Sequence, residues 1–114
     1  MSFSRTDAPA DPTQHPAMLR FAAAVRALYG DRVERIVLYG SRARGDARED
    51  SDWDVAVFLR GPLQWWPEVS RLGDISTKLL FDTGAVISAK PFPAQAYERR
   101  TALMHDVRQD GRDL

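Results

Sequence analysis

The chain has 114 residues, a length typical of one domain, and its sixteen basic and sixteen acidic residues give a formal net charge of zero. A protein that coats nucleic acid needs an excess of basic residues to neutralise phosphates, so we expect no direct DNA binding. The absence of cysteine excludes disulfides, cysteine nucleophiles and cysteine zinc sites. No apolar run is long enough for a membrane span, and the first fifteen residues lack the apolar core of a signal peptide, so we expect a cytoplasmic protein.

The N-terminal part of the chain divides into an arm and the start of a domain. Residues 1–15 are rich in proline and small polar residues, and we interpret them as a flexible arm. The remaining residues, 16–114, are expected to form a single domain. Its first element is a helix over 16–29, which starts at a proline and stops at Gly30.

The rest of the domain alternates strands and helices. A β-branched run predicts a strand over 33–39, and a second strand is expected over 52–59. An amphipathic pattern predicts a helix over 65–81. A third strand over 84–89, ended by prolines, and a last helix over 94–108 complete the prediction. This order favours an α/β or α+β fold with helices on a small sheet.

A possible anion site follows the first predicted strand. The chain runs from this strand into the segment Gly40-Ser41-Arg42-Ala43-Arg44-Gly45. A strand that turns through Gly-Ser into a short helix points backbone N–H groups at one spot, which suits an anion. A lone Gly-Ser is usually only a turn. The segment is not a P-loop, because Asp46-Ala47 stands where that motif has Lys-Ser or Lys-Thr.

Two carboxylates lie near the start of the second predicted strand. Strand alternation places Asp52 and Asp54 on one face, about 5–7 Å apart. At an effective dielectric constant of about 20 their repulsion costs on the order of 3 kcal/mol. Arg42 or Arg44 could compensate it, and Mg²⁺ or Mn²⁺ would do so more completely. An Asp-x-Asp alone is usually a solvated strand end, but its combination with an anion cradle favours a site.

The two motifs together resemble a known superfamily. Gly40-Ser41, ten residues and Asp52-Trp53-Asp54 form the signature of the DNA polymerase beta-like nucleotidyltransferases. The segment 40–46 with 51–55 is similar to the minimal nucleotidyltransferases, which often pair with a helical HEPN-domain protein as a toxin–antitoxin module. The resemblance implies a nucleotidyltransferase fold, in which a small mixed sheet carries helices mainly on one face.

The resemblance also implies a role for each matching residue. Gly40 and Ser41 would contact the nucleotide phosphates, with support from Arg42 and Arg44. Asp52 and Asp54 would hold one or two Mg²⁺ or Mn²⁺ ions. The implied reaction transfers a nucleoside monophosphate, with AMP from ATP as the expected case, to a hydroxyl. A tyrosine of a HEPN partner is the expected acceptor, because a phenol loses its proton more readily than a serine hydroxyl, and the implied biological role is that of an antitoxin.

One departure from the family pattern leaves a second function open. Family enzymes usually carry a third carboxylate on the next strand, but the predicted strand 84–89 has no acid and Asp82 is a weak substitute. The alternative is a domain without transfer activity that neutralises its partner by binding alone. The pair Trp65-Trp66 likewise has two interpretations, a hydrophobic staple at a helix start or a partner surface.

Overall fold

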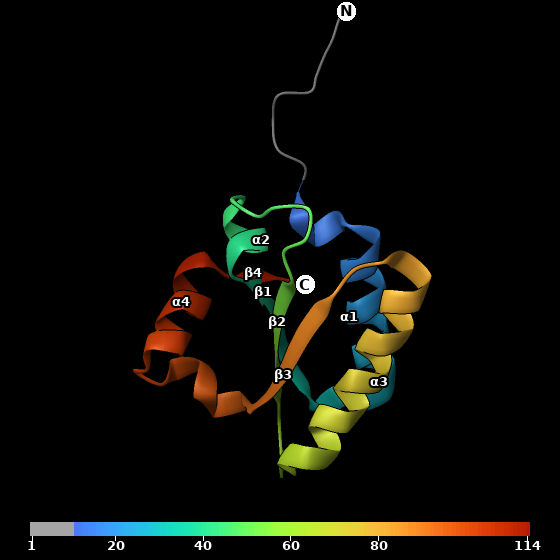
Figure 1. The fold of residues 1–114 in the computed structure, drawn as a ribbon. Helices are drawn as coiled ribbons and strands as arrows, with labels where there is room; N and C mark the ends of the chain where they lie inside the picture. Colours follow the sequence, from blue (N-terminus) through green and yellow to red (C-terminus); the bar gives the residue numbers. More distant parts are fainter. Residues whose placement is uncertain (1–10) are drawn as a thin grey trace, which may run out of the picture.

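The computed structural model describes residues 11–114 (Figure 1). The α-helices and strands of this part of the chain follow the order α1 (Pro16–Tyr29), β1 (Val33–Tyr39), α2 (Ser41–Arg44), β2 (Trp53–Leu59), α3 (Trp65–Thr83), β3 (Ile87–Pro93), α4 (Ala102–Asp110) and β4 (Arg112–Asp113). Three short 3-10 helices are η1 (Pro12–Gln14), η2 (Gly30–Arg32) and η3 (Ala94–Glu98). Most of the arm expected over 1–15 lies outside the described residues, so its flexibility stays a prediction.

The strands form one mixed sheet in the order β3-β2-β1-β4. β2 pairs antiparallel with β1 and parallel with β3, while β4 adds a short antiparallel edge to β1. The predicted α+β fold with a small mixed sheet is therefore confirmed. The loop ends of β1 and β2 come together, because Tyr39 pairs with Asp54. This pairing places the Gly-Ser turn next to the two carboxylates.

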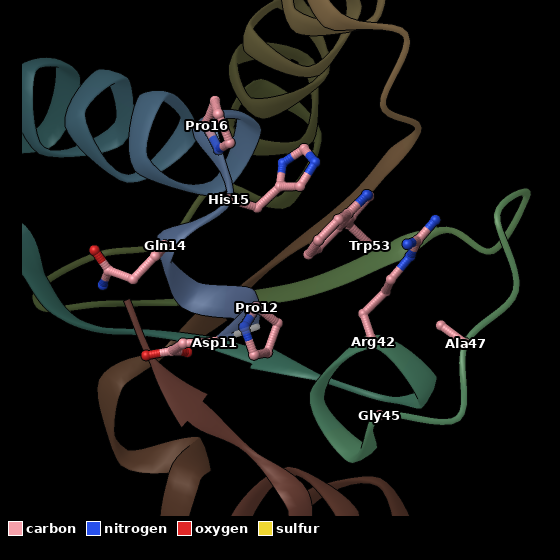
Figure 2. Close-up of a pocket in the computed structure, with 9 residues that line it drawn as sticks. All are labelled: Asp11, Pro12, Gln14, His15, Pro16, Arg42, Gly45, Ala47 and Trp53. Carbon is pink, nitrogen blue, oxygen red and sulfur yellow. The ribbon is translucent and has the colours of Figure 1, made fainter. Parts of the chain in front are cut away.

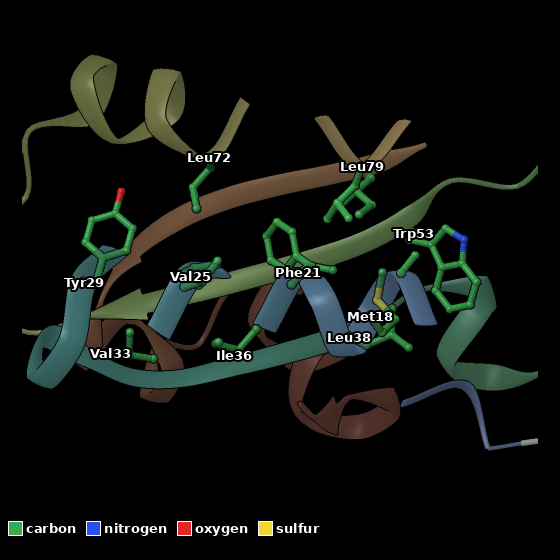
Figure 3. Close-up of a cluster of buried hydrophobic side chains, with 14 of the residues drawn as sticks. Met18, Phe21, Val25, Tyr29, Val33, Ile36, Leu38, Trp53, Leu72 and Leu79 are labelled. Atoms are coloured by element: carbon green, nitrogen blue, oxygen red, sulfur yellow. The ribbon is translucent and has the colours of Figure 1, made fainter. Parts of the chain in front are cut away.

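Each face of the sheet has its own hydrophobic cluster. The larger cluster joins α1 and α3 to the sheet and contains Phe21, Val25, Val55, Val57 and Leu72 among its buried side chains (Figure 3). The second cluster joins the other face to η3 and α4, and its buried members are Val37, Tyr39, Ala56, Phe58, Ala96, Met104 and Val107. Figure 1 shows the two long helices on one side of the sheet and α4 on the other. The expectation of helices mainly on one face thus holds for α1 and α3, and α4 covers part of the second face.

Four predicted elements differ from the structure. The strand expected over 52–59 begins one residue later, at Trp53, so Asp52 lies outside it, and the helix expected over 65–81 continues to Thr83. The other two differ more. The strand expected over 84–89 is β3, Ile87–Pro93, and it includes both prolines that were expected to end it. Proline is tolerated there because β3 is an edge strand and has a partner on one side only. The helix expected over 94–108 is η3 followed by α4, which begins only after Thr101 caps its first turn. Between residues 11 and 114, no helix has the length and apolar composition needed to cross a membrane.

One buried charge ties α1 to α3. Glu68 is 2% exposed, and its Oε1 accepts hydrogen bonds from the Tyr29 hydroxyl at 2.9 Å and from Arg71 at 2.8 Å. Burial acts to raise the pKa of Glu68, but these hydrogen bonds and the charges of Arg71 and Arg32 outweigh it and hold the pKa below its usual value. Burial and the hydrogen bond to Glu68 raise the pKa of Tyr29 to about 12. The carboxylate therefore stays ionised and fully bonded at neutral pH.

We expect Glu68→Ala to lower the free energy of unfolding by about 1–3 kcal/mol at pH 7, because it leaves the buried Tyr29 hydroxyl without its acceptor. Glu34→Ala is the matched control, since Glu34 pairs with Arg60 on the exposed surface and should cost less than about 1 kcal/mol. The pKa of Glu68 is lower in the folded than in the unfolded protein, so its ionisation stabilises the fold at a pH above the unfolded pKa. The stability lost in Glu68→Ala should therefore shrink as the pH falls through the folded pKa of Glu68. Urea titrations of both variants measure this, and equal losses would contradict it.

Candidate active site

The turn between β1 and α2 lies against the carboxylate of Asp54. Gly40 has φ +76°, and a Cβ built on it would lie 2.6 Å from Asp54 Oδ2. A Cβ at this distance would force the Asp54 carboxylate to move, and the positive φ favours glycine at this position. The N–H groups of Ser41 and Arg42 open α2, where the first amides have no carbonyl partner within the helix. Free backbone donors and a carboxylate therefore share one place.

Asp52 and Asp54 stand at the start of β2. Asp54 is partly buried on the face of α4, and Asp52 is exposed just before the strand. Within residues 11–114, no hydrogen bond or ion pair engages either carboxylate. Burial is the main cause that raises the pKa of Asp54; the Lys90 ammonium opposes the rise, Asp52 adds to it and Arg44 opposes it. Asp52 thus acts to raise the pKa of Asp54, and the two positive charges act against that rise.

Arg42 holds the loop that leads into Asp52. Its Nη2 donates to the carbonyl oxygen of Ser51 at 2.8 Å and to that of Glu49 at 2.9 Å. Its guanidinium also lies over the Trp53 ring, 4.5 Å from the centroid. These contacts fix residues 49–53 and thereby the position of Asp52. Direct contact of Arg42 with a nucleotide stays a prediction.

Arg44 is also held within the chain. It forms ion pairs with Asp46 at 3.2 Å and with Asp110 of α4 at 3.6 Å. Its charge also acts on Asp54, where it opposes the rise in pKa that burial causes. Arg44 therefore links α2 to α4 beside the site, and its role in nucleotide binding stays a prediction.

Lys90 is a site residue that the sequence reasoning missed. It lies on β3, where it pairs with Ala56, while Ser88 pairs with Asp54. Residues paired across parallel strands share a face, so Ser88 and Lys90 belong to the face of Asp54. Lys90 follows directly after the strand predicted over 84–89. It joins this face because β3 continues through both prolines, and the sequence could have indicated it only if the strand had been extended in that way.

Within residues 11–114, two of the pockets border α2, and neither is lined by Asp52 or Asp54. One has a volume of about 600 Å³ and is lined by η1, Arg42 and Trp53, among others (Figure 2). Figure 2 shows Trp53 between His15 and Arg42, and the rings of His15 and Trp53 are 4.6 Å apart. Because Trp53 and Asp54 alternate along β2, this pocket lies across the strand from Asp54. The second pocket, about 370 Å³, lies between η1, α2 and Arg112.

The residues around Asp54 fit a hard divalent cation. Two carboxylates without hydrogen-bonding partners in the described chain offer the oxygen ligands that Mg²⁺ and Mn²⁺ prefer. Mg²⁺ commonly takes one or two protein carboxylates and completes its shell with water and phosphate oxygens. No cluster of three or more His, Cys, Asp or Glu side chains that could hold a metal occurs among the described residues, so no third acid joins Asp52 and Asp54.

Gly40→Ala is expected to weaken the binding of Mg-ATP by at least about 10-fold, because its methyl group must displace the Asp54 carboxylate. Gly45→Ala is the matched control. Gly45 also has a positive φ of +87°, but a Cβ there meets nothing within 4 Å. Gly40, with ψ −159°, has a conformation that essentially only glycine adopts, whereas Gly45, with ψ 11°, is left-handed helical. Melting temperatures of both variants separate the cost of this backbone strain from the effect of the contact with Asp54. Isothermal titration of each with Mg-ATP measures the difference, and equal affinities would place the site elsewhere.

Comparisons of the sequence with known proteins agree on one family. The model of the nucleotidyltransferase domain family matches residues 18–103. A candidate protein adenylyltransferase of Methanocaldococcus jannaschii is 30% identical over 103 residues, which are 89% of this chain and 97% of that protein.

Solved structures share the fold at lower identity. A crystal structure of a toxin–antitoxin with AMP-PNP superimposes with a TM-score of 0.59 and 18% identity, over 82% of this chain and 68% of that chain. A structure of a MntA–HpeT toxin–antitoxin mutant gives 0.58 and 16%, over 81% and 68%. A candidate nucleotidyltransferase from Sulfolobus solfataricus gives 0.58 and 14%, over 95% and 90%. At these identities the likeness concerns the fold.

Proposed function

The chain belongs to the nucleotidyltransferase domain family, as a minimal nucleotidyltransferase of the DNA polymerase beta-like superfamily, and from this premise we propose that it transfers AMP from ATP to a hydroxyl group. The observation that carries the proposal is the contact between the Gly40 turn and the Asp54 carboxylate. It supports the proposal because the free amides at the start of α2 lie beside a carboxylate, and these groups suit phosphate oxygens and a cation. The test is binding: Mg-ATP must bind the wild-type protein and must not bind when Asp52 and Asp54 are both replaced by asparagine.

The transfer reaction gives each site residue a defined role. The acceptor oxygen forms a bond to the α-phosphorus, and the bond from this phosphorus to the bridging oxygen breaks. Pyrophosphate leaves with the electron pair, and the acceptor proton passes to solvent. Ser41 and the amides at the start of α2 would hold the phosphates, and Asp52 and Asp54 would hold the cation, while Arg42 positions the loop that leads into Asp52. Bound Mg²⁺ neutralises phosphate charge as it develops.

We further propose that the acceptor is a tyrosine of a HEPN-domain toxin and that the protein acts in the cytoplasm as an antitoxin. Support comes from relatives described as a candidate protein adenylyltransferase and as toxin–antitoxin structures. A second support is the surface of α3, where Trp66 is 74% and Phe81 83% exposed. Large exposed aromatic side chains are typical of protein interfaces. Of the two interpretations of Trp65-Trp66, this exposure favours the partner surface.

The second candidate function is neutralisation by binding alone. It is favoured by the lack of a third acid beside Asp52 and Asp54 in the described chain. General-base assistance is typically worth about 10²–10⁴-fold in rate, so a site without that acid transfers more slowly. The two functions differ in whether the partner is covalently modified.

A further inference from the structure

The face of β3 next to Asp54 carries a serine and a lysine. Ser88 lies directly beside Asp54, and Lys90 lies one pair further along, beside Ala56. From strand spacing and rise, the Cα atoms of Lys90 and Asp54 are about 8 Å apart. The four-carbon stem of lysine covers most of this distance along the sheet face, and the Asp54 side chain extends from its own Cα, so the two charged groups can approach each other. The ammonium group can therefore reach the place where the carboxylates and the Gly40 turn meet.

Lys90 is a positive charge on this sheet face that no acidic residue of 11–114 pairs with. It forms no ion pair with any residue from 11 to 114, whereas Arg44 is already bound to Asp46 and Asp110. Of the charges that act on Asp54, that of Lys90 has the largest effect, ahead of Asp52 and Arg44. Lys90 is exposed, so it is available to a ligand.

We propose that Lys90 binds the transferring phosphate and supplies the second positive charge of the site, so that Asp52 and Asp54 hold a single divalent ion. This proposal rests on the proposed nucleotidyl transfer and states how that site is charged. Two carboxylates can balance one divalent cation. A second divalent cation on this face would need further oxygen ligands, and it would be repelled by the ammonium group that lies there instead.

The ammonium group acts by charge and not by proton transfer. As the acceptor oxygen bonds to the α-phosphorus, negative charge builds on the non-bridging oxygens of that phosphate. A lysine held beside the carboxylates stabilises this charge in the same way as a cation of a two-metal site would. The step takes no proton from the ammonium group, and the acceptor proton passes to solvent.

The number of bound ions tests the proposal directly. The probe is Mn²⁺ with an ATP analogue that carries a methylene bridge between its α- and β-phosphates. Electron paramagnetic resonance of free Mn²⁺ counts the ions, and calorimetry gives the affinity of the analogue. We expect one Mn²⁺ per bound analogue in the wild-type protein. Lys90→Gln should weaken the analogue about 10-fold or more, and Lys90→Arg should retain most of the affinity.

Matched variants separate charge at the site from charge in general. Lys78→Gln removes the chain's other lysine, which pairs with Asp82 on α3, and should leave the affinity unchanged. The double variant Ser88→Asp/Lys90→Gln places a third carboxylate beside Asp54 and should bind two Mn²⁺ per analogue. Both β3 residues lie on an edge strand and are not core residues, so melting temperatures should confirm that the variants fold.

The following results would contradict the proposed role of Lys90. Two Mn²⁺ in the wild-type protein, or unchanged affinity in Lys90→Gln, would overturn the role of Lys90 while leaving nucleotidyl transfer intact. A double variant that still binds one Mn²⁺ would show that Lys90 does not exclude the second ion. A wild-type protein that binds no analogue with either Mn²⁺ or Mg²⁺ would overturn the proposed function and this inference with it.

Discussion

Mg-ATP should raise the melting temperature of the wild-type protein and leave that of the Asp52→Asn/Asp54→Asn variant unchanged. A ligand that binds only the folded state stabilises it by mass action, by about 2.7 kcal/mol when the free ligand is 100 times its Kd. For a domain of this size that corresponds to about 10 °C. The double variant keeps the shape of both side chains but loses the charges that would hold the cation. Thermal unfolding with and without Mg-ATP measures the effect.

The same variant should be at least as stable as the wild-type protein without nucleotide at pH 7. Burial, with repulsion from Asp52, raises the pKa of Asp54 above its usual value. A carboxyl group with a raised folded-state pKa favours folding at low pH, and that contribution is lost as the pH rises through the folded pKa. Asparagine is neutral at every pH, so the stability difference between variant and wild type should grow from acidic to neutral pH.

Glu49→Gln/Asp50→Asn is the control for this experiment. Both residues are exposed in the same loop, and removing them changes the net charge by the same amount. The control should keep the full shift with Mg-ATP. The assignment of the metal site would be wrong if the Asp52→Asn/Asp54→Asn protein showed the same nucleotide-induced shift as the control.

The first half of the fold was predictable because its signals are local. Helix α1 has the predicted bounds, since a proline opens it and Gly30, with φ +54°, ends it. Strand β1 likewise has the predicted bounds, because a β-branched run ends at a glycine that the next turn requires. In both cases the residues that define the ends lie within the element or next to it.

The second half depended on contacts between distant residues. Pro91 and Pro93 end a strand when only the local sequence is considered, yet they belong to β3 because it pairs with β2 on one side only. The short strand β4 exists through its pairing with Val37 and Leu38 of β1, and two residues carry too little pattern to be predicted. Edge position and strand pairing are tertiary properties, so they could not be predicted from local composition.

The candidate site also combines local motifs, which the sequence predicted, with contacts that depend on strand pairing. Gly40, Ser41, Asp52 and Asp54 form two contiguous motifs, and the alternation along β2 correctly placed Asp54 opposite Trp53. The contact of Gly40 with Asp54 and the presence of Lys90 on the same face follow from the registers of β1 and β3 with β2. Arg42 was expected near the nucleotide. Its hydrogen bonds to the carbonyl oxygens of Glu49 and Ser51 depend on the folded loop, so the sequence pattern did not predict them.

Covalent modification of the partner should separate an enzyme from a binding protein. We expect the purified protein alone to release little or no pyrophosphate from ATP, because no acid beside Asp52 and Asp54 in the described chain can act as the base. A tyrosine of the partner can still react, since a phenol has a pKa near 10 and needs less help to lose its proton than a serine hydroxyl. Co-expression with the HEPN-domain partner should therefore add the mass of one or more adenylyl groups to a partner tyrosine.

The loss of that mass in a single variant ties the modification to the site. Asp52→Asn should abolish the adenylyl groups while the complex still forms, because Asp52 is exposed at the loop and makes no contact that the fold requires. Asp50→Asn, in the same loop, should keep them. Intact-mass and peptide mass spectrometry of each co-expressed pair make the comparison. If the Asp52→Asn/Asp54→Asn protein still neutralises its partner in a tight, unmodified complex, then the protein acts by binding alone, and the carboxylate pair has no part in the neutralisation.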